Sequence, residues 1–229
     1  LWEEKASTFL VKNSLPKISG PWKLMLLGDG SPTRHLQLLT NQETKIKLIS
    51  MQLDPLSTQE VGVFDRVIAR YDKIDVIDAH PDHADYLADK LREIDVIECM
   101  AFGKKPKEAL MSAFDYDMAT MTVVDKANKP LAMFGVGEND EMPYMWMLGT
   151  KEFPKVARRD LIKHSKTWVR ELLKITGGSA GNVVHCYNRP AVRWLEWLGA
   201  NFTQQLTIKG EPFYQFILIN HEVVDEFYV

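Results

Sequence analysis

The sequence has few cysteines and no metal-binding pattern. Cys99 and Cys186 are the only two cysteines, and neither lies in a C-x-x-C or Cys/His spacing that would hold zinc. Two thiols so far apart are typical of reduced, half-buried side chains in a cytosolic protein. His80 and His83 are three residues apart, but their acidic neighbours indicate a helix start. We therefore predict neither a disulfide scaffold nor a metal site.

The sequence also lacks long apolar runs and a strong charge of either sign. No stretch approaches the roughly 18 apolar residues that span a bilayer, and residues 1–16 lack the apolar core of a signal peptide. The formal net charge of -3 leaves little long-range attraction for a phosphate backbone, although local basic patches are compatible with it. We expect a cytoplasmic protein with no membrane segment and no nucleic acid as its default partner.

What is present is a regular alternation of strand-like and helix-like patterns from Ile74 onward. The chain has 229 residues, 45% of them hydrophobic, which is enough for one full core and a small appendage. Strand patterns cover residues 74–79, 119–127, 129–139, 142–150, 182–188, 201–210 and 211–220. Helical patterns cover residues 80–95, 105–117, 154–176 and 190–200. This order predicts a single mixed α/β sheet flanked by helices.

Residues 1–60 form a separate pattern. An apolar run ends in a Gly-Asp-Gly turn, Ser31-Pro32 opens a helix, and residues 45–51 resemble a strand. Such a β-α-β appendage cannot bury both faces of its strands alone, so it must dock on another surface. Residues 54–62 are the expected junction. We predict an N-terminal segment over residues 1–60 and a second domain over residues 61–229.

The second domain resembles the GNAT acyltransferase superfamily over residues 63–219. The order of its elements matches, and so does a local N-x-x-A pattern, Asn188 to Ala191, followed by a helix that ends in Leu-Gly-Ala. Within the superfamily it is most similar to small GNAT-fold proteins of short-tailed phages, in the group that makes internal virion protein A. The similar features are the helix VRWLEWLGANF, the strand GEPFYQFIL and a basic helix after the fourth strand. This resemblance implies a place in the virion or in the host cytoplasm, with virion or host proteins as partners.

The first segment resembles cyanobacterial and plastid chorismate lyase-like proteins over residues 21–59. The run LLGDGSPTRHLQLLT carries the similarity, which implies that Thr33 and Arg34 contact a carboxylate. No matching pattern follows Glu60. The resemblance therefore covers only the start of such a fold.

The GNAT resemblance implies a binding site for acetyl-CoA. The superfamily holds the pyrophosphate with backbone N–H groups of a glycine-rich loop before the long helix. Here the loop has no glycine after Gly149, and Pro154 lacks an N–H donor. We predict that basic side chains replace the missing N–H donors as phosphate ligands: Lys151, Lys155, Arg158 and Arg159. The alternative is that these residues form a solvated helix start. Met147, Leu148 and Gly149, at the end of the fourth strand, are the predicted pantetheine partners, with core packing as the alternative for Met147.

The catalytic groups that the resemblance implies are incomplete. Leu195 occupies the position, seven residues after Asn188, where the family often has a tyrosine that protonates the thiolate, and leucine has no proton to donate. Tyr187 is a displaced donor candidate, although packing on one strand face with His185 is the alternative. Glu138 is the candidate general base, with Asp125 and Asp140 as alternatives. We predict Glu138, Tyr187 and Asn188 as the catalytic set.

Three functions follow as hypotheses. The first is a phage-type protein that has kept the acyltransferase scaffold, lost catalysis and any cofactor, and acts through surfaces such as Trp194, Trp197 and the last hairpin. The second is an active acyl-CoA-dependent N-acyltransferase that binds phosphate through basic side chains. The third is a chorismate lyase-like activity of the N-terminal segment. The sequence leaves the oligomeric state open.

Overall fold

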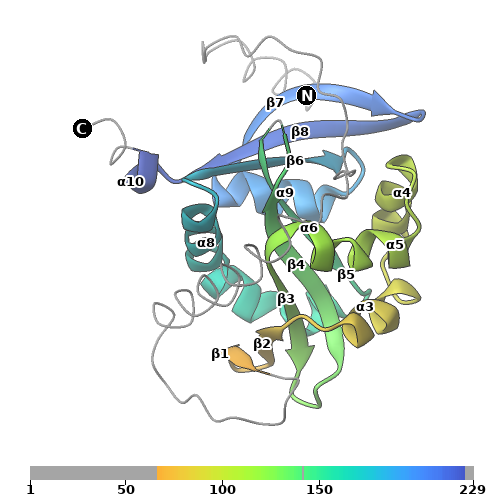
Figure 1. The fold of residues 1–229 in the computed structure, drawn as a ribbon, viewed down its shortest axis with the longest axis vertical. Helices are drawn as coiled ribbons and strands as arrows, with labels where there is room; N and C mark the ends of the chain where they lie inside the picture. The colour runs from red at the N-terminus through yellow and green to blue at the C-terminus, as the bar shows by residue number, and fades with distance from the viewer. Residues whose placement is uncertain (1–65, 141, 225–229) are drawn as a thin grey trace.

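The computed structural model describes residues 66–140 and 142–224, and these form one sheet with helices on both faces (Figure 1). The predicted appendage over residues 1–60 lies outside the described residues. The eight strands lie in the order β1-β2-β3-β4-β5-β6-β8-β7. They are β1 (Val67–Arg70), β2 (Ile74–Asp78), β3 (Asp117–Asp125), β4 (Pro130–Glu138), β5 (Pro143–Gly149), β6 (Ser179–His185), β7 (Asn201–Ile208) and β8 (Glu211–Ile219).

The described helices fall into two groups. In Figure 1, α3, α4 and α5 lie to the right of the strands and α8 lies to the left. The first group is α3 (Pro81–Ala88), α4 (Glu93–Ala101), α5 (Pro106–Met111) and α6 (Ala113–Tyr116). The second group is α7 (Phe153–Val156), α8 (Arg158–Ile175), α9 (Arg189–Leu198) and α10 (His221–Val224). The predicted mixed α/β sheet flanked by helices is confirmed.

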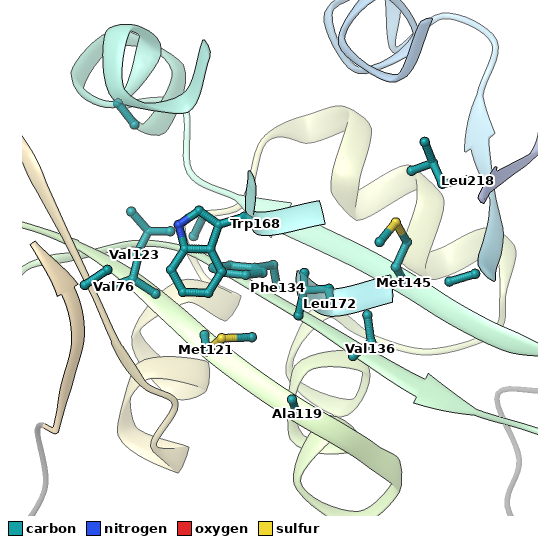
Figure 2. Packing of buried hydrophobic residues seen from close by; sticks show 14 of the residues in the cluster. Val76, Ala119, Met121, Val123, Phe134, Val136, Met145, Trp168, Leu172 and Leu218 are labelled. Carbon is teal, nitrogen blue, oxygen red and sulfur yellow. The ribbon is translucent and has the colours of Figure 1, made fainter. Parts of the chain in front are cut away.

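Each face of the sheet has its own core. Phe134, Trp168 and Leu172 pack together between the sheet and α8, and the Phe134 and Trp168 rings meet edge to face with centroids 5.6 Å apart (Figure 2). On the other face, Leu87 and Met133 belong to the core under α3, α4 and α5. Because side chains alternate along a strand, β4 supplies Phe134 to one core and Met133 to the other. This double burial explains why β4 reads as a nearly continuous apolar run.

Two elements near the start of the described chain differ from the predictions. The helix predicted over residues 80–95 ends at Ala88, because Leu91 forms a β-bridge with Thr150 and the backbone N–H of Arg92 donates to Gly149. A new helix, α4, then begins. The other difference is β1, which no pattern predicted and which extends the sheet by pairing antiparallel with β2.

The turn into β6 is also earlier than predicted. The strand begins at Ser179 and ends at His185, whereas the sequence pattern indicated residues 182–188. Gly177 and Gly178 have positive φ, and the N–H of Gly178 donates to Leu173 at the end of α8. Only glycine adopts this conformation without strain, so the pair ends the helix and allows the strand to begin at Ser179.

Candidate functional site

An opening between β5 and β6 is the main irregularity of the sheet. These parallel strands pair only at Tyr144 and Gly181 and then diverge toward their C-terminal ends. Near this apex, the Asn182 Nδ2 donates to the Met145 carbonyl at 2.7 Å. A Cβ on Gly181 would lie 2.8 Å from the Phe216 carbonyl oxygen and closer still to Met142. Glycine therefore allows the close packing at the apex, and β5 and β6 do not pair with each other beyond it.

The backbone N–H and C=O of Met147 face this opening. The Met145 carbonyl accepts a hydrogen bond from the Asn182 side chain on β6. The Gly149 N–H donates to Asp95, and the Gly149 carbonyl accepts from the Arg92 N–H. The backbone polar groups of Met145 and Gly149 therefore point away from β4. In an antiparallel ladder every second residue points the same way. The Met147 N–H and C=O consequently point toward β6, which pairs with β5 only at the apex. The opening thus contains one donor and one acceptor on the edge of β5.

Asp95 closes the β5 side of the wide end. Its Oδ2 accepts from the Gly149 N–H at 3.0 Å, and Arg92 donates to both carboxylate oxygens at 2.9 and 2.6 Å. The side chain is fully buried. Burial raises the pKa of Asp95, and the Arg92 hydrogen bond and charge lower it in part. The buried ion pair fixes the start of α4 against the end of β5.

Glu98, one turn further along α4, closes the β6 side. Its Oε1 accepts from the His185 N–H at 3.0 Å and from the Asn188 Nδ2 at 3.1 Å. Burial raises the pKa of Glu98, while the hydrogen bond from Asn188 opposes that shift. Two carboxylates three residues apart on α4 therefore hold the two diverging strands, one each.

Asn188 lies at the start of α9 with one unsatisfied atom. Only 3% of the residue is exposed, and its Oδ1 has no hydrogen-bond partner among the described residues. A buried amide oxygen without a donor is costly, which makes it a candidate ligand contact. The Nδ2 orients the side chain by donating to Glu98.

His185 and Tyr187 do not share a strand face, because β6 ends at His185. The Nδ1 of His185 accepts from the Tyr187 N–H at 3.2 Å, so its Nε2 carries the proton that Glu211 accepts at 2.9 Å. The histidine is buried, whereas Tyr187 is 70% exposed. The alternative reading of Tyr187 as a strand residue is wrong, although its ring centroid lies 5.5 Å from that of His185, and its side chain is exposed on the β6–α9 turn.

Leu195 is a core residue. It is 6% exposed and belongs to the cluster between the sheet, α8 and α9. Trp194 packs against the same cluster and donates to the Ser165 Oγ at 3.2 Å, while Trp197 is 42% exposed. The predicted exposed aromatic stripe is therefore half core, as helical spacing requires.

The loop before α8 is basic and solvent-exposed. The short helix α7 contains Pro154, and its first N–H, of Phe153, already donates to Thr150. The side chains of the four basic residues are exposed, and none forms an ion pair within the described parts of the chain: Lys151, Lys155, Arg158 and Arg159. Asp160 is buried in the first turn of α8, where it accepts from the Lys73 N–H at 2.8 Å and complements the helix dipole.

Asp117 is a buried carboxylate that no sequence pattern indicated. It is 7% exposed, and its oxygens accept from the Tyr144 hydroxyl at 2.8 Å, the Trp146 Nε1 at 2.7 Å and the Thr120 hydroxyl at 3.0 Å. Burial raises the pKa of Asp117 to about 6, and the three hydrogen bonds limit that rise. Tyr144 also lies at the apex of the opening. This cluster therefore connects a buried proton acceptor with the candidate site.

Two glycines of β4 make room for the cluster. A Cβ on Gly135 would lie 2.4 Å from the Asp117 Oδ2, and a Cβ on Gly137 would overlap the Tyr144 hydroxyl. The side chains of β3 and β5 thus meet across β4. The G-x-G spacing inside an otherwise apolar strand was the sequence signal for a close approach, because interior glycine weakens a strand unless something packs over it.

The acids considered as bases from the sequence lie in turns and at a strand end. Asp125 accepts from the N–H groups of Ala127 and Lys129 in the β3–β4 turn. Glu138 is exposed at the end of β4, opposite Pro143, and no structural feature tests its predicted role. His80 accepts from the Asp82 N–H as the N-cap of α3, as the predicted helix start requires.

Residues 66–140 and 142–224 contain neither a metal-binding cluster nor a membrane-spanning helix. No group of three or more His, Cys, Asp or Glu side chains in this part is arranged to hold a metal ion. None of its helices combines the length and the apolar character needed to cross a membrane.

The chain resembles known proteins in two ways. A family model described as chorismate pyruvate-lyase Rv2949c-like matches residues 26–69, which overlaps the lyase-like segment identified in the sequence. Comparison with curated protein sequences gives no match. Nearly all of the matched segment lies outside the described residues, so the structure adds nothing to that similarity.

Solved structures share the fold of the described part. A chimeric spermidine N-acetyltransferase from Vibrio cholerae is 12% identical, with a TM-score of 0.50 over 67% of this chain and 99% of its own. A GNAT-family acetyltransferase from Bacillus anthracis is 10% identical, with a TM-score of 0.45 over 66% and 97%. Spermidine N-acetyltransferase from Vibrio cholerae in complex with CoA and spermine is 12% identical, with a TM-score of 0.49 over 66% and 98%. The predicted GNAT fold is confirmed, and identities this low establish the fold alone.

Proposed function

We propose that this chain binds an acyl-CoA in the opening between β5 and β6 and transfers the acyl group to an amine. The observation that carries the proposal is the direction of the Met147 N–H and C=O, which point into a gap between two strands of a GNAT fold and have no pairing partner on β6. An extended chain of amides, such as pantetheine, is the type of ligand that pairs with an exposed strand edge. The shared fold with a spermidine N-acetyltransferase supports an amine as the acceptor.

The acyl end of the ligand would lie against β5. The Met147 N–H would donate to the thioester carbonyl oxygen and stabilise the negative charge that develops there. Leu148 would form the wall on the side of α3, α4 and α5, where it belongs to the second core. The Oδ1 of Asn188, which has no donor among the described residues, would accept from a pantetheine amide.

The phosphates would bind to side chains rather than to a backbone nest. Pro154 offers no N–H, and the Phe153 N–H is already used. Lys155 and Arg158 are exposed on either side of the α7–α8 junction, next to the end of β5. Together with Lys151 and Arg159 they would supply charge, so binding should weaken with salt.

Proton transfer would use Asp117 and Tyr187. As the amine nitrogen attacks the thioester carbon, its proton passes to the Tyr144 oxygen while the Tyr144 proton moves to the Asp117 Oδ1. The C–N bond forms, the C–S bond breaks, and the thiolate takes a proton from the exposed Tyr187 hydroxyl. A base with a pKa of about 6 is ionised at neutral pH and still able to accept a proton. Glu138 remains the alternative base.

Calorimetric titration with acetyl-CoA at low and then moderate salt tests the proposal. We expect micromolar binding that weakens with salt and is lost in the double variant Lys155→Ala, Arg158→Ala. The matched control is Lys105→Ala, Lys107→Ala on α5, across the sheet, which should bind normally. Release of CoA thiol with a panel of primary amines, including spermidine, then tests transfer. Absence of binding at millimolar acetyl-CoA would overturn the proposal.

A second candidate is a scaffold without catalysis that acts as a virion or host-interaction protein. The observation in its favour is that α4 already occupies the strand-end N–H groups of Gly149 and His185, while Leu195 is packed in the core. Such a protein would neither bind acetyl-CoA nor release thiol. Binding in the titration above would rule it out as the sole function.

A third candidate is a chorismate lyase-like activity of the N-terminal segment. It rests on the family-model match over residues 26–69. The test is release of pyruvate from chorismate by the full chain. A rate no greater than that of buffer would eliminate this activity.

A further inference from the structure

The exposed charge of α8 has a single sign. Its exposed charged side chains are all basic: Arg158, Arg159, Lys163, Lys166, Arg170 and Lys174. Its two acids, Asp160 and Glu171, are both about 5% exposed. A chain with a net charge of -3 therefore presents one strongly positive helix face.

Five of these residues form a continuous stripe, which we call the α8 stripe: Arg159, Lys163, Lys166, Arg170 and Lys174. They are spaced by three or four residues, which places them on one side of a helix that turns every 3.6 residues. At a rise of about 1.5 Å per residue, the stripe is about 22 Å long. It is a straight row of cations on the outer side of the layer that covers the main core.

Little negative charge opposes the central part of the stripe. Asp160 is turned inward to the Lys73 N–H. Glu171 accepts from Lys174 at 3.1 Å and lies 3.8 Å from Arg170, so it neutralises the C-terminal end in part. In the described parts of the chain, neither Lys163 nor Arg159 forms an ion pair.

The neighbouring helix α9 extends the positive face. Lys166 lies over the Trp197 ring, with Nζ 4.6 Å from its centroid, so the two helices meet at this point. Arg189 and Arg193 are exposed on α9, and Glu196 is its one exposed acid. The basic surface therefore spans two adjacent helices.

We propose that the α8 stripe binds the phosphate backbone of double-stranded nucleic acid. A duplex carries about one negative charge per 1.7 Å of its axis, which a row of cations about 22 Å long can follow. The net charge does not prevent this contact, because charges are screened beyond about 8 Å at physiological salt. Single strands need aromatic stacking platforms, and the exposed Trp197 ring is already covered by Lys166. The contact would position the protein without reading sequence.

The test is binding of a fluorescent 25-base-pair duplex to the full chain, followed by anisotropy at several salt concentrations. For each phosphate contact, the logarithm of the binding constant should fall by about 0.9 for every tenfold increase in salt concentration. In the triple variant Lys163→Glu, Lys166→Glu, Arg170→Glu, affinity should fall at least about tenfold and the salt slope should decrease by about 2.7. The control is Lys90→Glu, Lys105→Glu, Lys107→Glu around α3 and α5, which changes the net charge equally and should bind normally.

The stripe residues mutated here are not those proposed for the CoA phosphates, so either proposal can be refuted without refuting the other. The triple variant should keep its acetyl-CoA affinity if the chain binds acetyl-CoA, and its melting temperature should stay close to that of the original chain. No duplex binding at 50 mM salt would overturn the proposal. So would an equal loss in both triple variants, tighter binding of a single strand, or equal binding of polyglutamate.

Discussion

The Nδ2 of Asn188 and the Oε1 of Glu98 lie 3.1 Å apart and join α9 to α4 across the open end of the β5–β6 gap. The two helices cover opposite faces of the sheet, so this contact passes through it. It exists because the strands diverge there. The same divergence leaves the Asn188 Oδ1 without a donor among the described residues.

Asn188→Ala should destabilise the protein by about 1–3 kcal/mol, because Glu98 loses a donor while partly desolvated. Chemical denaturation measures the change. In the double variant Asn188→Ala, Glu98→Gln, the change in the free energy of unfolding should differ from the sum of the two single changes by about 0.5–3 kcal/mol. Strict additivity would show that the contact does not contribute to stability.

Gly135→Ala should destabilise the protein by about 1–3 kcal/mol, since the new methyl group would overlap the Asp117 carboxylate and the backbone below it. Gly149→Ala is the comparison, because the nearest neighbour of its methyl group would be the edge of the Phe153 ring, 3.2 Å away. Thermal unfolding should rank Gly135→Ala as the more damaging change. The reverse order would contradict the packing of the Asp117 cluster.

The raised pKa of Asp117 gives its contribution to stability a definite sign. Folding favours the protonated form of this carboxyl, so its contribution is greatest below the unfolded pKa of about 4 and is lost as the pH rises to about 6. A shift of about 2 units corresponds to about 3 kcal/mol. Asp117→Asn should therefore remove the Asp117 contribution to the pH dependence of unfolding between pH 4 and 6, while the other buried carboxyls, Asp95 and Glu98, keep theirs. An unchanged profile would contradict the shift.

If Asp117 is the base, the rate of acyl transfer should rise with pH through about 6 in the original chain. Asp117→Asn should lower kcat by about 10²–10⁴-fold with little change in acetyl-CoA affinity. Glu138→Gln is the matched control, and its rate should stay close to normal. A large loss in Glu138→Gln instead would return the role of base to the exposed acid.

Leu195→Tyr should not restore catalysis, although it places a phenol at the position where the GNAT resemblance implies one. Leu195 is buried in the main core, so the larger ring should cost about 1–3 kcal/mol through overpacking. Denaturation and thiol-release assays measure the two effects. A gain in rate without a loss of stability would mean that this position faces the opening.

The sequence by itself determined the order of the elements and the class of fold, because those depend on local periodicity. The double burial of β4 appears in the sequence as an apolar run, and the helical pattern over residues 154–176 predicted the long helix α8. The sequence also showed that the phosphate-binding loop lacks a backbone donor, since proline has no N–H in any context.

Only the tertiary structure decided how the candidate site is closed. Asp95 stood at the end of a predicted helix and Glu98 lay outside every predicted element, yet both bind the ends of strands more than fifty residues away in sequence. Asp117 read as part of a helix end, but three side chains from β3 and β5 surround it. Sequence patterns report which face of an element is apolar. They do not report which polar side chains a divergent pair of strands brings together, because that depends on long-range packing.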